Sequence, residues 1–105
     1  MANKQFYREY TNVSNSLFDA LIGFKCNPSV KDFVFCIIRE TYGYQEKERE
    51  ISIERIAELL NVSHRRAYKI RSLAVKSGLV INDKNRYSIQ EDSSLWKRLK
   101  SDGSE

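Results

Sequence analysis

Residues 51–78 constrain the fold more than any other part of the chain, because they hold two amphipathic helical patterns joined by only three residues. In the first pattern, IERIAELL, apolar residues recur at helical spacing behind Ser52, a good N-cap residue. Ser63 is placed to cap the second pattern, and Gly78 is placed to end it. Two such helices with a short turn between them predict a helix-turn-helix unit.

The second of these helices carries an unusual charge at its start, where His64, Arg65 and Arg66 occupy the first turn. The exposed N–H groups and the positive dipole of a helix N-terminus favour acidic residues, so basic residues there are mildly unfavourable. No acidic residue lies between His64 and Gly78, whereas six glutamates lie within residues 40–58. We therefore expect an anion to bind at this end of the helix.

Helical geometry also predicts which side chains of residues 63–76 face outward. If Ala67, Ile70 and Ala74 face the core, the remaining polar side chains lie on the outer face or along its edges. The candidate binding residues of this segment are Ser63, His64, Arg65, Arg66, Tyr68, Lys69, Arg71, Ser72 and Lys76.

The apolar period changes after residue 78. LVI at 79–81 and RYSI at 86–89 are β-prone runs on either side of the polar link NDKN, which predicts a β-hairpin. Asn82 and Asn85 would supply the turn geometry, and Lys84 and Arg86 complete the list of candidate binding residues.

Two further helices are expected before this region. Ser14 opens NSLFDALIGF, and Asn27 with Pro28 opens a helix over residues 28–42 that Gly43 would end in a left-handed conformation. The charged run QEKERE at 45–50 is expected to be a solvated loop, followed by a short strand at Ile51.

This order of elements predicts a mainly α fold with a small β-hairpin, the α+β winged helix-turn-helix. We expect an N-terminal arm over residues 1–12, the winged-helix domain over 13–90 and a polar tail over 91–105. In such modules the second helix of the pair enters the major groove, so the expected anion is a phosphate of double-stranded DNA.

Arg65 is the first candidate for a base contact, followed by His64, Tyr68 and Lys69. The expected phosphate contacts are Arg66, Arg71 and Lys76, with Lys84 and Arg86 reaching the flanking backbone or minor groove.

Composition argues against other classes. The chain has 105 residues and a net charge of +4. Its two cysteines and one histidine are too few for a zinc site. It also has no glycine-rich phosphate loop. His64 has no suggested base or nucleophile partner, so we expect no enzyme activity, no metal, no cofactor and no small-molecule substrate. No apolar run approaches the roughly 20 residues that span a bilayer. We therefore expect no membrane partner and a cytoplasmic protein.

Four stretches resemble the bacteriophage replication protein O family, as in phage lambda. They are VSNSLFDAL (13–21), IIRETYGY (37–44), ISIERIAELLNVSHRRAYKIR (51–71) and SGLVI (77–81). The resemblance implies a winged-helix domain that binds repeated sites in phage or prophage replication origins, in the cytoplasm or nucleoid of the bacterial host. It also implies a homodimer on those sites, and replication-initiation proteins as partners through a segment absent here. Family members usually have smaller residues at the positions of Arg65 and Arg66, so only the mode of recognition carries over.

Two alternatives remain open at this point. A transcriptional regulator could use the same module, and sequence does not separate it from a replication protein because a fold does not fix its biological context. A protein-interaction module could instead turn this surface toward an acidic or DNA-mimicking partner. Steep salt dependence of duplex binding distinguishes both DNA-binding functions from the interaction module.

Overall fold

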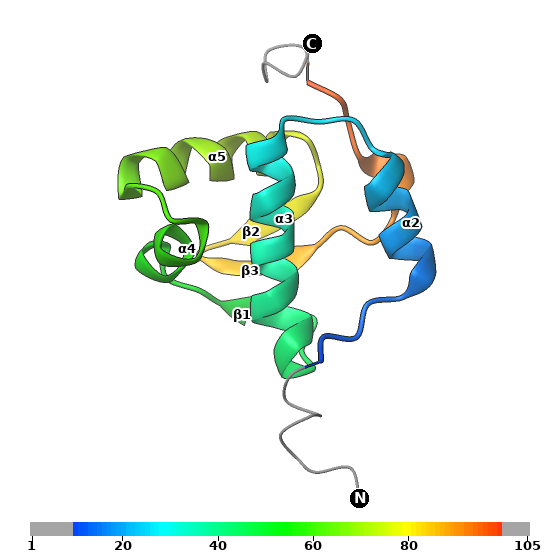
Figure 1. Cartoon of the computed structure of the whole chain (residues 1–105), viewed down its shortest axis with the longest axis horizontal. Helices are drawn as coiled ribbons and strands as arrows, with labels where there is room; N and C mark the ends of the chain where they lie inside the picture. The colour runs from blue at the N-terminus through cyan, green and yellow to red at the C-terminus, as the bar shows by residue number, and fades with distance from the viewer. Residues whose placement is uncertain (1–9, 100–105) are drawn as a thin grey trace, which may run out of the picture.

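Four α-helices and three β-strands form the described part of the chain, residues 10–99 of the computed structural model (Figure 1). The α-helices are α2 (Asn15–Gly23), α3 (Pro28–Thr41), α4 (Ile53–Leu60) and α5 (His64–Lys76). The strands are β1 (Glu48–Glu50), β2 (Val80–Asp83) and β3 (Arg86–Ile89). Short 3-10 turns follow α3 at Tyr42–Tyr44 and follow β3 at Ser93–Leu95.

Each α-helix begins directly after the polar residue that the sequence predicts as its cap. The side chains of Ser14, Asn27, Ser52 and Ser63 each accept a hydrogen bond from a backbone N–H in the first turn, at 2.8 to 3.1 Å. These bonds satisfy N–H groups that have no partner within the helix. The predicted starts of all four helices are therefore confirmed.

The three strands form one antiparallel sheet in the order β1-β3-β2. Strands β2 and β3 are joined by the two-residue turn Lys84 and Asn85, whose φ angles are 52° and 70°. Positive φ at both positions is typical of the turn that matches the right-handed twist of a hairpin. The side chain of Asn82 accepts a hydrogen bond from the backbone N–H of Asn85 at 3.0 Å, so the predicted hairpin is confirmed.

Two local expectations are wrong. The first strand is Glu48–Glu50, inside the run predicted as a loop, and Ile51 follows it as a buried residue. This run has no apolar pattern that would predict a strand. The strand forms because its backbone pairs with β3, where Arg49 lies opposite Tyr87. Gly43 does not end α3 in a left-handed conformation, because the helix tightens into a 3-10 turn and Gln45 takes φ 62° instead.

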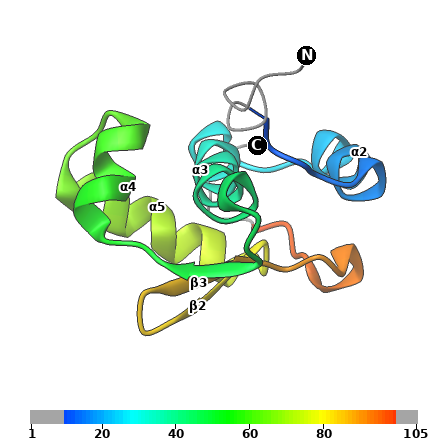
Figure 2. The same ribbon diagram turned by 90° about the horizontal axis from the view of Figure 1, so that it is seen from below.

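Helix α3 lies at the centre of the molecule and supplies more buried apolar residues than any other helix from residue 10 to residue 99. Phe33, Val34 and Ile37 are completely buried, and the ring of Phe33 meets the ring of Tyr87 on β3 edge to face at 6.2 Å between centroids. From below, the sheet lies on one side of α3 and α2 lies beside that helix (Figure 2). The result is a mainly helical α+β fold of the winged-helix-like type, as the sequence predicts.

The chain that follows β3 packs back onto the domain. Trp96 is buried, its ring meets the ring of Phe24 at 5.4 Å, and its indole N–H donates to the backbone oxygen of Gln90 at 2.7 Å. The backbone N–H of Lys97 donates to the oxygen of Ser77, just beyond α5, at 2.6 Å. This segment therefore joins the loop after α2 to the end of α5.

Candidate nucleic-acid interface

Helix α5 presents its polar side chains outward, because its apolar side chains are held in the core. Ala67, Ile70 and Ala74 are buried, which fixes the rotation of the helix. The exposed candidate residues of this helix are His64, Arg65, Arg66, Tyr68, Lys69, Ser72 and Lys76, and the capping residue Ser63 is exposed beside them. Arg71 is only partly exposed.

The cations on the outer face of α5 have no acidic partner within residues 10–99. Arg65, Lys69 and Lys76 form no ion pair there. The cations of β1 and α4 differ, because Arg49 and Arg55 both pair with the buried carboxylate of Glu40. The positive charge of α5 is therefore available to an external anion, and the exposed N–H groups of the helix start lie at the same end.

Arg66 and Arg71 lie at the edges of this surface and contact neighbouring elements. A guanidinium nitrogen of Arg66 is 3.4 Å from the hydroxyl oxygen of Ser29, in the first turn of α3. Arg71 donates to the hydroxyl of the buried Tyr87 at 3.2 Å, and its guanidinium carbon lies 4.9 Å from the centre of the Tyr68 ring. Arg71 thus connects α5 to β3 and also supports the exposed ring of Tyr68.

The two hairpin candidates have different surroundings. Lys84 is exposed in the turn and forms no ion pair with any residue from 10 to 99. Arg86 begins β3, and its Nε lies 3.9 Å from a carboxylate oxygen of Glu48 on the neighbouring strand β1. Sequence reasoning missed this pair and the Arg71 contact, because both depend on how the sheet is assembled.

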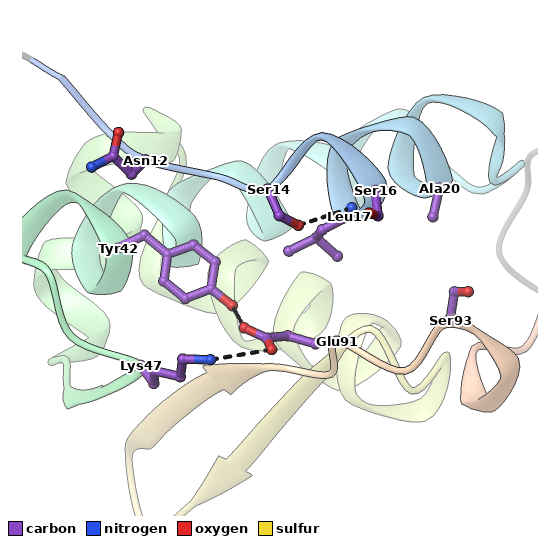
Figure 3. A pocket seen from close by; sticks show the side chains of 9 residues that line it. All are labelled: Asn12, Ser14, Ser16, Leu17, Ala20, Tyr42, Lys47, Glu91 and Ser93. Carbon is purple, nitrogen blue, oxygen red and sulfur yellow. Dashed lines mark hydrogen bonds and ion pairs between the residues drawn. The ribbon is translucent and has the colours of Figure 1, made fainter.

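A second cluster of polar groups surrounds a cavity of about 410 Å³ between the start of α2, the turn after α3 and the segment after β3 (Figure 3). The Tyr42 hydroxyl donates to one oxygen of the Glu91 carboxylate, and Lys47 Nζ lies 3.4 Å from the other. Burial first, and then the Glu91 carboxylate, raise the pKa of Tyr42. The Tyr42 hydrogen bond and, to a smaller extent, Lys47 lower the pKa of Glu91. Through these contacts the chain after β3 is tied to the turn after α3.

Neither a metal-binding cluster nor a membrane-spanning helix occurs within residues 10–99. No three histidine, cysteine or acidic side chains lie close enough together there to hold a metal ion. Nor does any helix in that range combine the length and apolar character needed to cross a membrane.

The helix pair, its outward cations and the hairpin define a small winged-helix-like domain, the class in which the second helix of the pair is exposed. The model of the bacteriophage replication protein O family matches residues 3–96 of the 105-residue chain. The chain therefore belongs to this family, as its sequence resemblance predicts, and the family supports a role in phage DNA replication. No curated protein and no solved structure matches the chain.

Proposed function

We propose that this chain binds double-stranded DNA sequence-specifically through α5 and recognises a phage or prophage replication origin when replication is initiated. The outward cations of α5 that lack an acidic partner within residues 10–99 are the observation that carries the proposal. Membership of a phage replication family supports the biological context. On this proposal the protein is a binding protein without catalytic activity, and it acts in the host cytoplasm.

The proposed contacts divide into two kinds. Arg65 is exposed in the first turn of α5, where its planar guanidinium can donate two parallel hydrogen bonds to guanine O6 and N7. Lys76 lies three turns further along the helix and would contact a phosphate, which adds affinity without reading sequence. Lys84 would reach the neighbouring backbone from the hairpin turn.

Salt dependence tests whether the surface binds duplex DNA. With 4 to 6 phosphate contacts, we expect affinity for a fluorescent duplex to fall about 10² to 10³-fold between about 50 and 200 mM salt. Fluorescence anisotropy of the full chain measures this directly. Absence of binding at low salt would contradict the proposal and favour the protein-interaction module.

Two variants test the roles of individual cations. Arg65→Ala should relax preference at one base pair, at a cost of about 1 to 3 kcal/mol on the preferred site only. Lys76→Ala should weaken all sequences alike and reduce the salt slope by about one. Lys47→Ala is the matched control, since Lys47 pairs with Glu91 beside the cavity of Figure 3 and not on α5. Equal losses for Arg65→Ala on preferred and random duplexes would contradict base readout.

Selection from a random duplex pool tests origin recognition. Repeated copies of the selected sequence near the gene would support a replication origin bound by more than one copy of the chain. A single copy at a promoter would instead support a transcriptional regulator. Replication-initiation proteins are further proposed partners at the origin.

A further inference from the structure

A groove of about 620 Å³ lies where the turn after α3 meets the chain that precedes α2. We name it the tyrosine groove, and it is lined by Tyr10, Asn12, Arg39, Tyr42, Gly43, Tyr44 and Gln45. Its volume falls within the range of about 300 to 1,000 Å³ that is typical of ligand sites. Helix α5 lies beside the start of α3, whereas this turn lies at the other end of that helix (Figure 1). The tyrosine groove is therefore a separate surface from α5.

Two of the tyrosine rings in this groove are exposed. Tyr10 is 64% exposed and Tyr44 is 49% exposed, whereas Tyr42 is partly buried. The guanidinium carbons of Arg49 and Arg39 lie 4.1 and 5.5 Å from the centre of the Tyr44 ring. Contacts of a cation with the face of a ring are attractive and help to hold the ring in position. The groove thus presents flat aromatic surface, and one of its rings is oriented by two guanidinium groups.

Arg39 gives the tyrosine groove a positive charge. It is the one charged side chain in the lining among the described residues. It forms no ion pair within residues 10–99. Arg49 differs, because it pairs with Glu40 and Glu46. The charge of Arg39 is therefore available to an anion that enters the groove.

Gly43 provides the space in which the Arg39 side chain lies. A Cβ added at Gly43 would be 2.8 Å from a terminal nitrogen of Arg39 and 3.3 Å from the hydroxyl oxygen of Thr11. The φ angle of Gly43 is not positive, so its backbone does not itself require glycine. The absence of a side chain at this position instead lets the guanidinium lie across the turn, next to the exposed rings.

Exposed rings beside a cation without an acidic partner suit an unpaired nucleotide. Its flat base stacks on an aromatic ring, and its phosphate pairs with the cation. In a duplex the bases are stacked on one another, so their flat faces are not available to a side chain. A proline-rich peptide could pack on the tyrosine rings, but it would provide no anion for Arg39. Charge complementarity therefore favours a nucleic-acid strand over such a peptide.

We propose that the tyrosine groove binds single-stranded DNA, with bases stacked on Tyr10 and Tyr44 and a phosphate paired with Arg39. The role of the family in phage DNA replication favours DNA, because replication separates the strands of a duplex. The groove and α5 lie toward opposite ends of α3, so one copy of the chain can hold a single strand while α5 holds a duplex. Single-strand binding in the groove does not require that α5 bind DNA.

Two substitutions of Tyr44 test stacking. Tyr44→Ala should weaken binding of a fluorescent thymidine oligonucleotide about 5-fold or more, because it removes a ring on which a base stacks. Tyr44→Phe keeps the ring and should bind like the natural chain. Tyr68→Ala is the matched control, since Tyr68 is exposed to a similar extent but lies on α5. Fluorescence anisotropy of the full chain at low salt measures each affinity, with an excess of unlabelled duplex present to occupy α5.

Two further substitutions test the cation. Arg39→Gln should weaken binding and reduce the salt slope by about 0.7, the change expected for one phosphate contact on a single strand. Gly43→Ala should also weaken binding, because its methyl group displaces the guanidinium. Gly23→Ala is the control for it, since a Cβ at Gly23 meets no atom within 4 Å. Circular dichroism checks that Gly43→Ala is folded, which we expect because the atoms nearest its Cβ belong to side chains.

Several results would overturn single-strand binding in the groove. One is the absence of oligonucleotide binding at low salt, whether or not duplex is present. Another is a Tyr44→Ala or Arg39→Gln variant that binds like the natural chain, or a Tyr44→Phe variant that loses as much affinity as Tyr44→Ala. Displacement by thymidine monophosphate at equal nucleotide concentration would show a site for free nucleotides instead of a strand. Binding of a polyproline peptide, but not of the oligonucleotide, would show a protein partner. Duplex binding is measured in separate samples, so its outcome leaves this test intact.

Discussion

At the scale of single residues, Glu40 is a buried acidic side chain that pairs with two arginines. It is buried on α3, and its two carboxylate oxygens lie 3.3 Å from Arg55 on α4 and 3.8 Å from Arg49 on β1. Arg49 also donates to the backbone oxygen of Glu40 at 2.9 Å. One carboxylate thus holds a helix of the helix-turn-helix pair and the first strand against α3.

Replacing Glu40 tests how much this arrangement stabilises the fold. We expect Glu40→Gln to lower the free energy of unfolding by about 1 to 3 kcal/mol, because a buried neutral amide cannot satisfy two guanidinium groups. The control is Glu58→Gln, since Glu58 also pairs with Arg55 at 3.3 Å but is exposed. Exposed pairs contribute little, so its effect should stay within about 0.5 kcal/mol. If Glu40→Gln and Glu58→Gln lowered the free energy of unfolding equally in urea denaturation, burial of the Glu40 ion pairs would not be the source of their stabilising effect.

Tyr42 and Glu91 give a prediction that depends on pH. The Tyr42 hydrogen bond is the largest cause that lowers the pKa of Glu91. Because the folded pKa lies below the unfolded one, the interaction stabilises the protein above the ordinary pKa of glutamate and is lost as the pH falls through the folded value. Tyr42→Phe should therefore raise the pKa of Glu91 toward its ordinary value, as followed by NMR of the carboxyl carbon.

Tyr44→Phe is the matched control for that titration, because Tyr44 contacts the guanidinium groups of Arg39 and Arg49 with its ring. It should leave the titration of Glu91 unchanged. The hydrogen bond would not be the cause of the lowered pKa if Glu91 titrated alike in Tyr42→Phe and in the natural chain.

At the scale of elements, the connection from α5 to β2 depends on one glycine. Gly78 has φ +78°, and a Cβ added there would lie 2.6 Å from the backbone oxygen of Leu95. Gly78→Ala should cost about 1 to 3 kcal/mol, because an L side chain is strained at this φ and also meets a backbone atom. Thermal or chemical denaturation measures the loss.

Gly23, the last residue of α2, provides the comparison. A Cβ added at Gly23 meets no atom within 4 Å, so Gly23→Ala should leave stability unchanged or raise it by up to about 1 kcal/mol. The two substitutions are chemically identical and differ only in their surroundings. Similar effects on the free energy of unfolding would contradict the role given to the φ angle and the Leu95 contact.

The elements also show which parts of the fold can be predicted from sequence. The helix starts at Ser14 and Ser63 depend on bonds to residues three positions away, so local sequence contains the signal. The outward direction of the α5 cations likewise follows from the helical period. Strand β1 exists because Glu48–Glu50 pairs with residues almost forty positions later, which no local pattern reports. The Arg71 contact with Tyr87 likewise cannot be predicted from local sequence, because the two residues are 16 positions apart.

At the scale of the whole molecule, the segment after β3 connects distant parts of the chain. Trp96 is the only tryptophan, and it packs on Phe24 after α2 while its neighbour Lys97 bonds to Ser77 after α5. We expect unfolding measured by Trp96 fluorescence to coincide with loss of helix measured by circular dichroism, as in a single cooperative transition.

Phe24→Ala is the control for the agreement between the fluorescence and circular dichroism transitions, because it removes the aromatic ring that packs against Trp96. It should shift the fluorescence transition to lower denaturant than the circular dichroism transition. If the two transitions were already separate in the natural chain, the segment around Trp96 would not share the stability of the domain.

Strand β1 also has a consequence for how copies of the chain can meet. It forms one edge of the sheet, is three residues long and consists of Glu48, Arg49 and Glu50. A short edge with charged side chains is a poor template for an added strand, so cross-β stacking from this edge is disfavoured. The residues that sequence analysis treats as a solvated loop thereby protect the native state against fibril growth at that edge.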